Sequence, residues 1–376
     1  GGALRAVAVG RLNGAGAFPV LVKLLSDRHE MVREEAARGL GGLGNASAEG
    51  PLLAACAREP LAQTRYRLLS ALARLQSAQG LLLVEKALWE FDRLGEEGAE
   101  EQFPGILNYS DLLQQYPAAV AARSLAGFLL RAGCSALRLA ASMRLRDRPD
   151  PTAREALLAA ARDSYAVVRD NAMSGLGGLR DPSGTGVLVA GLSDPDTGGR
   201  AAAAYALGDF PQGEAVPALI ALLSDDDLVN GDEGDYVGNH AYHALKRYPP
   251  ETVASPLRAA LRPVPGQADN NLRIQAAGLL GELKVASALE EIRELLADPS
   301  ANVRQSACYS LGEMGDPRAV PALLEILRAD ASENVRWTAC EALGRLGDER
   351  SAPLLMKIAA CESDPLRVGA VKCLGQ

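Results

Sequence analysis

The chain repeats one pattern of apolar and polar positions, which is clearest between residues 302 and 348. Three apolar positions in the first half of this stretch recur 32 residues later: Val303 as Val335, Ala307 as Ala339, and Leu311 as Leu343. A repeat of this length predicts a solenoid of stacked helical repeats.

An arginine followed by leucine seven residues later marks the repeat along the chain. Ten arginines fit this rule: Arg5, Arg33, Arg65, Arg138, Arg169, Arg200, Arg273, Arg304, Arg336 and Arg367. Most steps are 31 or 32 residues, and a copy without the arginine is centred on Gly238. The 73 residues between Arg65 and Arg138 leave room for one further copy. The count is therefore about twelve repeats.

Each repeat predicts two helices. In the second helix, the residues three and seven positions after the arginine share one face, which suits close packing. The first helix of one repeat has apolar residues at Val320, Leu323 and Leu327, with Pro321 in its first turn, where a missing N–H costs little. The glycine eight positions after the arginine is predicted to end the second helix in a left-handed cap, at Gly41, Gly177, Gly208, Gly312 and Gly344.

The Val-Arg, Ala-Ala and Ala-Leu-Gly elements of this pattern resemble HEAT repeats, specifically the short HEAT-like repeats of phycobilin lyase subunits and bacterial scaffold proteins. The resemblance covers nearly the whole chain. It implies an all-α fold, a right-handed α-solenoid of about twelve helical hairpins, in which the second helices line the concave side. Residues 1–376 are then a single array. Both ends stop without a polar capping element, so we expect a fragment of a longer chain.

Composition agrees with thin stacked helices. Hydrophobic residues make up 48% of the chain but aromatic residues only 4%, so the core is built from Ala, Leu and Val. The net charge of -8 argues against a nucleic-acid partner, and no apolar run is long enough for a membrane span. The six cysteines contain no CxxC motif and are interpreted as small core residues in a reducing, cytoplasmic location.

Two repeats depart from the pattern, at residues 78–116 and 213–248. In the first, Pro104 interrupts the helices, and aromatic residues gather between Trp89 and Phe128. This cluster indicates either a locally thickened core or an exposed contact patch. In the second, Gly238 replaces the arginine and an acidic loop covers residues 225–235. Both insertions lie in the turn between the two helices of their repeat, so we expect them on the same ridge of the superhelix.

His240 and His243 follow the acidic loop and are the strongest candidates for metal binding. Three residues apart, they share one helix face, and Asp232 or Asp235 could assist. Two histidines without a third firm ligand form an incomplete site, so we predict no metal and no cofactor. A calcium loop is excluded because Leu228 stands where a ligand belongs.

The positions two and five after the arginine oppose the apolar face and are expected to be exposed in the concave groove. The candidate contact residues in these two positions are Tyr205, His240, His243, Tyr309, Asn171 and Met143. Asp226, Asp232 and Asp235 would form a rim loop beside them. Tyr and His are amphipathic side chains suited to contact surfaces, although ordinary solvated helix positions are the alternative interpretation.

An acidic residue often precedes the arginine by six positions. The residues at this position are Asp27, Glu59, Asp163, Asp194, Asp298 and Asp330. A carboxylate and a guanidinium at a fixed offset predict a structural ladder and not a ligand site.

These features favour a non-enzymatic scaffold that binds a peptide or protein in the groove. No nucleophile–base pair, phosphate loop or complete metal set is present, so an enzyme is uncertain and disfavoured. The alternative is a protein similar to bilin lyases that handles a tetrapyrrole, because the repeats resemble that group. Two other enzyme classes on HEAT repeats fit less well. Deoxyhypusine hydroxylases need repeated His-Glu pairs, and only His29-Glu30 is present; HEAT-type DNA glycosylases need a basic groove.

Overall fold

The computed structural model describes residues 16–262, 270–361 and 365–375. Within these ranges the regular elements are helices, apart from one isolated antiparallel bridge between Leu228 and Tyr236. The chain divides into two compact units, residues 1–179 and 180–376. No helix in the described ranges is long and apolar enough to cross a bilayer.

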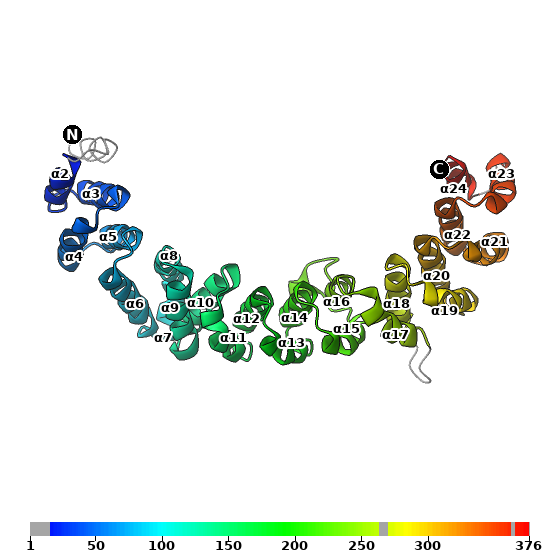
Figure 1. The fold of residues 1–376 in the computed structure, drawn as a ribbon, viewed down its shortest axis with the longest axis horizontal. Helices are drawn as coiled ribbons and strands as arrows, with labels where there is room; N and C mark the ends of the chain where they lie inside the picture. The colour runs from blue at the N-terminus through cyan, green and yellow to red at the C-terminus, as the bar shows by residue number, and fades with distance from the viewer. Residues whose placement is uncertain (1–15, 263–269, 362–364, 376) are drawn as a thin grey trace. The chain divides into compact units, whose positions relative to one another are not determined.

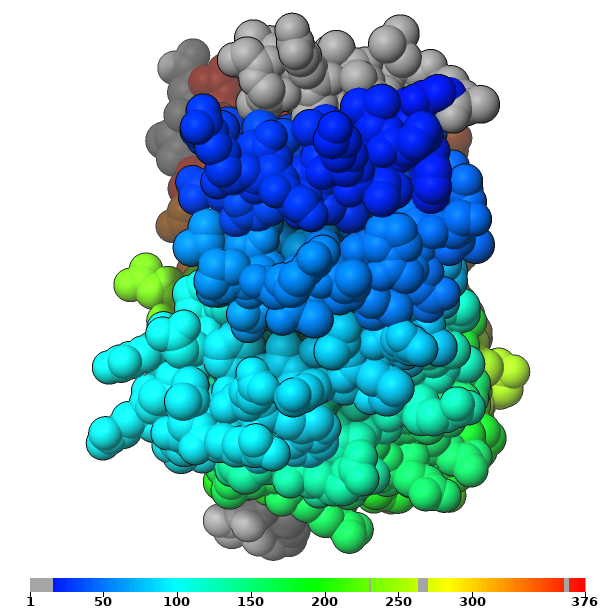
Figure 2. Space-filling view, turned by 90° about the vertical axis from the view of Figure 1, so that its left-hand side faces the viewer, coloured from blue at the N-terminus to red at the C-terminus, as the bar shows by residue number. Residues whose placement is uncertain are grey.

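The first unit is a stack of helical hairpins (Figure 1), and its residues follow one another in layers along the stack from the N-terminal end (Figure 2). The first helices of its hairpins are α2 (Ala17–Leu24), α4 (Glu49–Arg58), α6 (Ala78–Asp92), α9 (Ala118–Arg131) and α11 (Arg154–Ala160). The second helices are α3 (Glu30–Leu43), α5 (Ala62–Arg74), α8 (Phe103–Leu113), α10 (Ser135–Asp147) and α12 (Ala166–Leu179). An additional short helix, α7 (Gly95–Glu101), lies between α6 and α8 in sequence.

The second unit repeats the arrangement. Its first helices are α13 (Thr185–Gly191), α15 (Val216–Leu222), α17 (Pro250–Ala260), α19 (Leu289–Glu294), α21 (Val320–Ala329) and α23 (Ala352–Ala360). Its second helices are α14 (Thr197–Asp209), α16 (Val237–Leu245), α18 (Asn270–Glu282), α20 (Ala301–Met314), α22 (Glu333–Leu346) and α24 (Arg367–Leu374). Second helices of consecutive hairpins pack side by side, as Figure 1 shows for α18, α20 and α22. The predicted all-α solenoid of hairpins is confirmed.

The alanine and leucine positions form the core as predicted. Ala307 and Leu311 in α20, and Ala339 and Leu343 in α22, are fully buried. Alanine at this position lets neighbouring second helices approach closely. The low aromatic content of the chain follows from this thin, alanine-rich core.

The glycine eight positions after the arginine does not end the helix, so the predicted cap position is wrong. Gly41, Gly177, Gly208, Gly312 and Gly344 all lie inside second helices. A Cβ on Gly312 would lie 2.9 Å from the Cα of Ala342, which shows that this glycine permits backbone contact between helices. The left-handed caps come three residues later, at Gly44, Gly315 and Gly347, with φ of 63°, 70° and 59°.

A ladder of acids and arginines is present, but its carboxylates pair with the arginine of the preceding hairpin, and the arginine six residues after the acid bonds only the carbonyl oxygen of that acid. Arg304 donates from Nε and Nη2 to the carboxylate of Asp330 at 2.7 and 2.9 Å, and from Nη1 to the carbonyl oxygen of Asp298 at 2.9 Å. Asp330 also accepts from the backbone N–H of Ser332 at 2.8 Å, which holds the turn before α22. The same pairing recurs in Arg33 with Glu59, Arg138 with Asp163, Arg200 with Asp225, and Arg273 with Asp298.

Candidate functional site on the second helices

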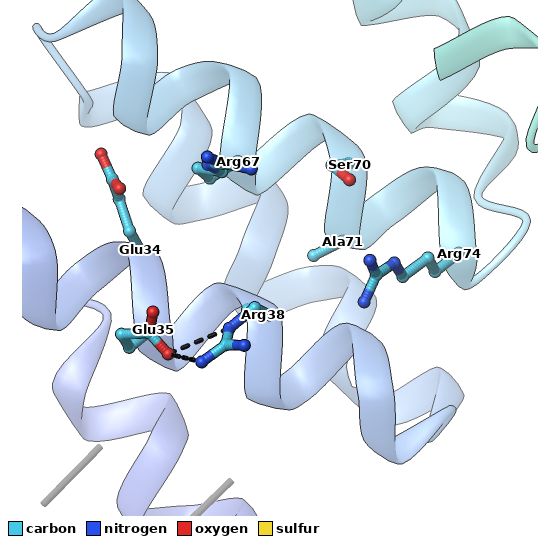
Figure 3. A pocket seen from close by; sticks show the side chains of 7 residues that line it. All are labelled: Glu34, Glu35, Arg38, Arg67, Ser70, Ala71 and Arg74. Carbon is cyan, nitrogen blue, oxygen red and sulfur yellow. Dashed lines mark hydrogen bonds and ion pairs between the residues drawn. The ribbon is translucent and has the colours of Figure 1, made fainter. Parts of the chain in front are cut away.

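The positions two and five after the arginine lie on one side of the second helices, which we call the second-helix face. Figure 3 shows this face on α3 and α5, where Glu35, Arg38, Arg67 and Ser70 line a hollow of about 270 Å³. Arg38 donates to Glu35 within α3, and Arg67 and Arg74 come from α5. The hollow in the first unit is therefore polar and rich in arginine.

Tyr205 on α14 is the most open tyrosine of the predicted set, with 51% of its surface exposed. The guanidinium carbon of Arg247, two residues after the end of α16, lies 5.3 Å from the centre of its ring. Arg247 also forms an ion pair with Asp209, which lies four residues after Tyr205 on α14. One face of the ring is thus covered by a cation whose charge is already balanced.

Tyr309 on α20 repeats this arrangement. The guanidinium carbon of Arg345, from α22, lies 5.3 Å from its ring centre, and Arg345 forms a 3.0 Å ion pair with Glu313, four residues after Tyr309. This combination of a tyrosine, an arginine over its ring and a carboxylate paired with the arginine occurs twice but was not predicted from the sequence. The signal was present, because both arginines stand nine positions after their repeat marker.

Glu282, at the end of α18, joins three second helices and was also missed. Tyr309 donates to its carboxylate at 3.2 Å, and the ammonium of Lys246, directly after α16, lies 2.6 Å from it. Burial alone would raise the pKa of Glu282, but the hydrogen bonds from Lys246, Tyr242 and Tyr309 outweigh it and lower the pKa. Burial, followed by the charge of Glu282, raises the pKa of Tyr242.

The two predicted histidines lie on α16 and differ in their contacts. His240 is half-buried, and its Nε2 lies 2.9 Å from Oδ1 of Asp235 in the acidic loop. His243 is exposed and packs edge-to-face on Tyr242, with 6.0 Å between ring centres. In the described ranges, no group of three or more His, Cys, Asp or Glu side chains could hold a metal ion.

The acidic loop has a structural role that explains the lost arginine. Asp225 completes the ladder pair of Arg200 at 2.7 Å, so the loop does not interrupt the ladder on that side. The backbone N–H of Gly238 donates to the carbonyl oxygen of Asp225, and a Cβ at Gly238 would lie 2.8 Å from the carbonyl oxygen of Leu223. Only glycine fits there. Asp226 and Asp232 are exposed at the outside of the loop.

The expectation that all six contact residues are exposed holds only for Tyr205 and His243, since Tyr309, like His240, is half-buried and Asn171 is buried. This residue is 3% exposed, donates to Ser142 at 3.1 Å and accepts from Arg146 at 2.8 Å. The physical reason is that Asn171 lies against α10, the preceding second helix, which supplies both Ser142 and Arg146. Met143, five after its arginine, is half-buried on α10. Met143 and Asn171 belong to the first unit, and the other four candidates belong to the second.

The aromatic cluster includes a thickened core, while its alternative role as an exposed contact patch stays a prediction. Phe128 is 1% exposed and packs on Trp89, with 4.8 Å between ring centres, which is a thickened core. Phe91 and Tyr109 are half-buried and pack against each other at 5.9 Å beside a cavity between α5, α6 and α8.

The chain is similar to proteins built from helical repeats. The sequence profile for HEAT repeats matches residues 2–90, 154–231, 185–266, 265–336 and 320–376. A curated relative, the uncharacterized phycocyanin operon protein Y of Pseudanabaena tenuis (strain PCC 7409), is 28% identical over 112 residues, which are 29% of this chain and 26% of the relative.

Solved structures with the same fold include importin beta and the karyopherin Kap121p. Importin beta superimposes with a TM-score of 0.57 at 16% identity, over 99% of this chain and 58% of the importin chain. Kap121p bound to the SUMO protease Ulp1p superimposes with a TM-score of 0.63 at 15% identity, over 96% of this chain and 46% of Kap121p. This chain therefore spans about half of the solved chains it matches. Because the HEAT profile covers most of the sequence, the chain belongs to the HEAT repeat family.

Proposed function

We propose that this chain is a non-enzymatic scaffold, and that the second-helix face of its second unit binds a peptide or protein segment. The observation that carries the proposal is the pair of tyrosines, Tyr205 and Tyr309, each with an arginine of the next hairpin over its ring. Tyr205 is exposed and Tyr309 is half-buried, so both offer a ligand part of an aromatic side chain at a defined position, and tyrosine is enriched where proteins bind one another.

The charged side chains of this face favour a ligand with apolar and uncharged polar groups over a highly charged ligand. Arg247 and Arg345 are each paired with a carboxylate, and so is Lys246. A polyanion would have to break these pairs, whereas a peptide with apolar and uncharged polar groups would not. His243 lies exposed on α16, next to the helix that carries Tyr205, and adds a donor or acceptor to the face.

The relatives support a protein partner in general terms. HEAT solenoids present extended surfaces to their ligands, and the similar Kap121p structures are described as bound to the proteins Ulp1p and Nup53p. A single continuous array and a cytoplasmic location, both expected from the sequence, belong to the same proposal. Tetrapyrrole binding is the competing hypothesis because of the phycocyanin operon relative.

Panning a random-peptide phage library on the purified protein tests the proposal. We expect enriched peptides whose binding, measured by fluorescence anisotropy, weakens in a Tyr205→Ala, Tyr309→Ala variant. Met356→Ala is the control, because Met356 is exposed but lies on α23, a first helix that is not part of the second-helix face. Failure to enrich any peptide, or equal binding by both variants, would overturn the proposal. An absorbance titration with a linear tetrapyrrole addresses the competing hypothesis.

A further inference from the structure

A cavity of about 590 Å³ lies in the first unit between α4, α5, α6 and α8. Its apolar wall includes Tyr66, Phe91 and Tyr109, whose rings meet edge-to-face with 5.7 Å between Tyr66 and Tyr109 and 5.9 Å between Phe91 and Tyr109. Its polar wall includes Arg65 and Lys86. Helix α8, which forms one wall, lies within residues 91–153, and the HEAT repeat profile does not match these residues.

Arg65 is a ladder arginine whose carboxylate is missing. It donates to the carbonyl oxygen of Glu59 at 2.6 Å, as Arg304 does to that of Asp298. In the described part of the chain, however, no carboxylate forms an ion pair with Arg65. The following hairpin inserts α7 and Gln102 before its second helix, where other hairpins place the ladder acid.

Arg65 is exposed because no carboxylate in the described ranges pairs with it. The paired side chains of Arg33, Arg138 and Arg304 are 15%, 14% and 15% exposed, whereas Arg65 is exposed to solvent. Its guanidinium group therefore retains free donors in a fixed fork, which matches the two oxygens of a carboxylate. Glu90 also lines the cavity but forms no ion pair with Arg65 in the described structure.

We propose that this cavity binds a carboxylate of a partner protein together with a neighbouring aromatic or large aliphatic side chain. The carboxylate would occupy the missing ladder position on Arg65, with Lys86 as a second cation. The apolar side chain would pack against Phe91 and Tyr109, since aromatic rings attract one another beyond the effect of the buried area. The wall residues Gln63, Lys86 and Gln102 are exposed, so the cavity is open enough for a chain segment to enter and leave. The site lies in the first unit and does not depend on the function proposed for the second.

Two immobilised hexapeptide libraries test the proposal. One contains an aromatic residue beside Asp or Glu, and the other has Asn or Gln at the same position; both have amidated ends. A third set carries the carboxylate only at a free C-terminus and separates side-chain from terminal carboxylates. We expect the full chain to bind members of an acidic set and not their neutral counterparts.

Variants of the chain then place the binding in the cavity. Arg65→Gln should weaken the selected peptide at least tenfold, about 1.4 kcal/mol. Arg74→Gln is the matched control, because Arg74 lies on the same helix but lines the hollow of Figure 3 and not the cavity. Ala87→Phe, which narrows the cavity while keeping both cations, should weaken binding as well. Circular dichroism checks that each variant is folded. Equal binding of acidic and neutral peptides, or an unchanged affinity in Arg65→Gln, would overturn the proposal.

Discussion

Arg304 holds the carboxylate of Asp330, 26 residues further along the chain, through hydrogen bonds of 2.7 and 2.9 Å from the same guanidinium group. The arginine is on α20 and the aspartate begins the turn into α22, so this pair fixes the position of one second helix against the next. Both side chains are largely buried, at 15% and 4% exposure. The pair belongs to the scaffold and not to a ligand site.

Replacing Arg304 with alanine should lower the free energy of unfolding by about 1 to 3 kcal/mol, because it leaves a buried carboxylate without its partner. Urea denaturation followed by circular dichroism measures the change. Arg65→Ala is the matched control, since this arginine forms the backbone hydrogen bond but no ion pair in the described structure, and its loss should be smaller. An Arg304→Ala variant as stable as the parent would show that the ladder is not structural.

The same pair should make stability depend on pH. The hydrogen bond from Arg304 lowers the pKa of Asp330 in the folded state. A depressed folded pKa contributes stability above the unfolded pKa, about 3.9, and this contribution is lost as pH falls through the folded value. The difference in unfolding free energy between the parent and Arg304→Ala should therefore be constant from about pH 5 to 7 and shrink below about pH 4. A difference that grows on acidification would contradict this assignment. Asp330→Asn should remove the effect.

The second-helix glycines that stand eight positions after the arginine and touch the next second helix, such as Gly312, should tolerate no side chain. Gly312→Ala would place a Cβ 2.9 Å from the Cα of Ala342, which belongs to backbone, so we expect a loss of about 1 to 3 kcal/mol in unfolding free energy. Gly186→Ala is the control, because a Cβ there meets nothing within 4 Å and the helix should gain up to about 1 kcal/mol. Thermal denaturation of the two variants should move in opposite directions. A tolerated alanine at Gly312 would mean that the helices do not pack as closely as described.

The sequence predicted the features that recur at a fixed interval. These features are the buried alanine and leucine positions and the ladder. Each depends on residues in consecutive repeats, so the repeat length alone is enough to locate them. Gly312 was misassigned because glycine serves both left-handed caps and close backbone contact, and only φ and the distance to Ala342 distinguish the two. Asn171 was expected to be exposed because its burial depends on the neighbouring helix and not on its own.

The functional residues were harder to predict than the scaffold. Tyr205 and Tyr309 were chosen from their position in the repeat, but the arginines that cover their rings come from the next hairpin and were not considered. Glu282 lies at the end of its helix, outside the two positions that were compared. The significance of Arg65 depends on a carboxylate that is missing from the following hairpin, which becomes visible only when the other ladder pairs are known.

The most direct test of the proposed function is the affinity of one selected peptide for a His240→Ala, His243→Ala variant, measured by isothermal titration calorimetry. Helical content should be retained, because His243 is exposed and His240 is half-buried with one polar contact to Asp235. His29→Ala, which alters the one other histidine of the sequence, is the control. We predict that the double variant binds at least tenfold more weakly, about 1.4 kcal/mol, while the control binds like the parent. Unchanged affinity in the double variant would contradict the proposed role of the second-helix face and move the binding site to the aromatic cluster between Trp89 and Phe128.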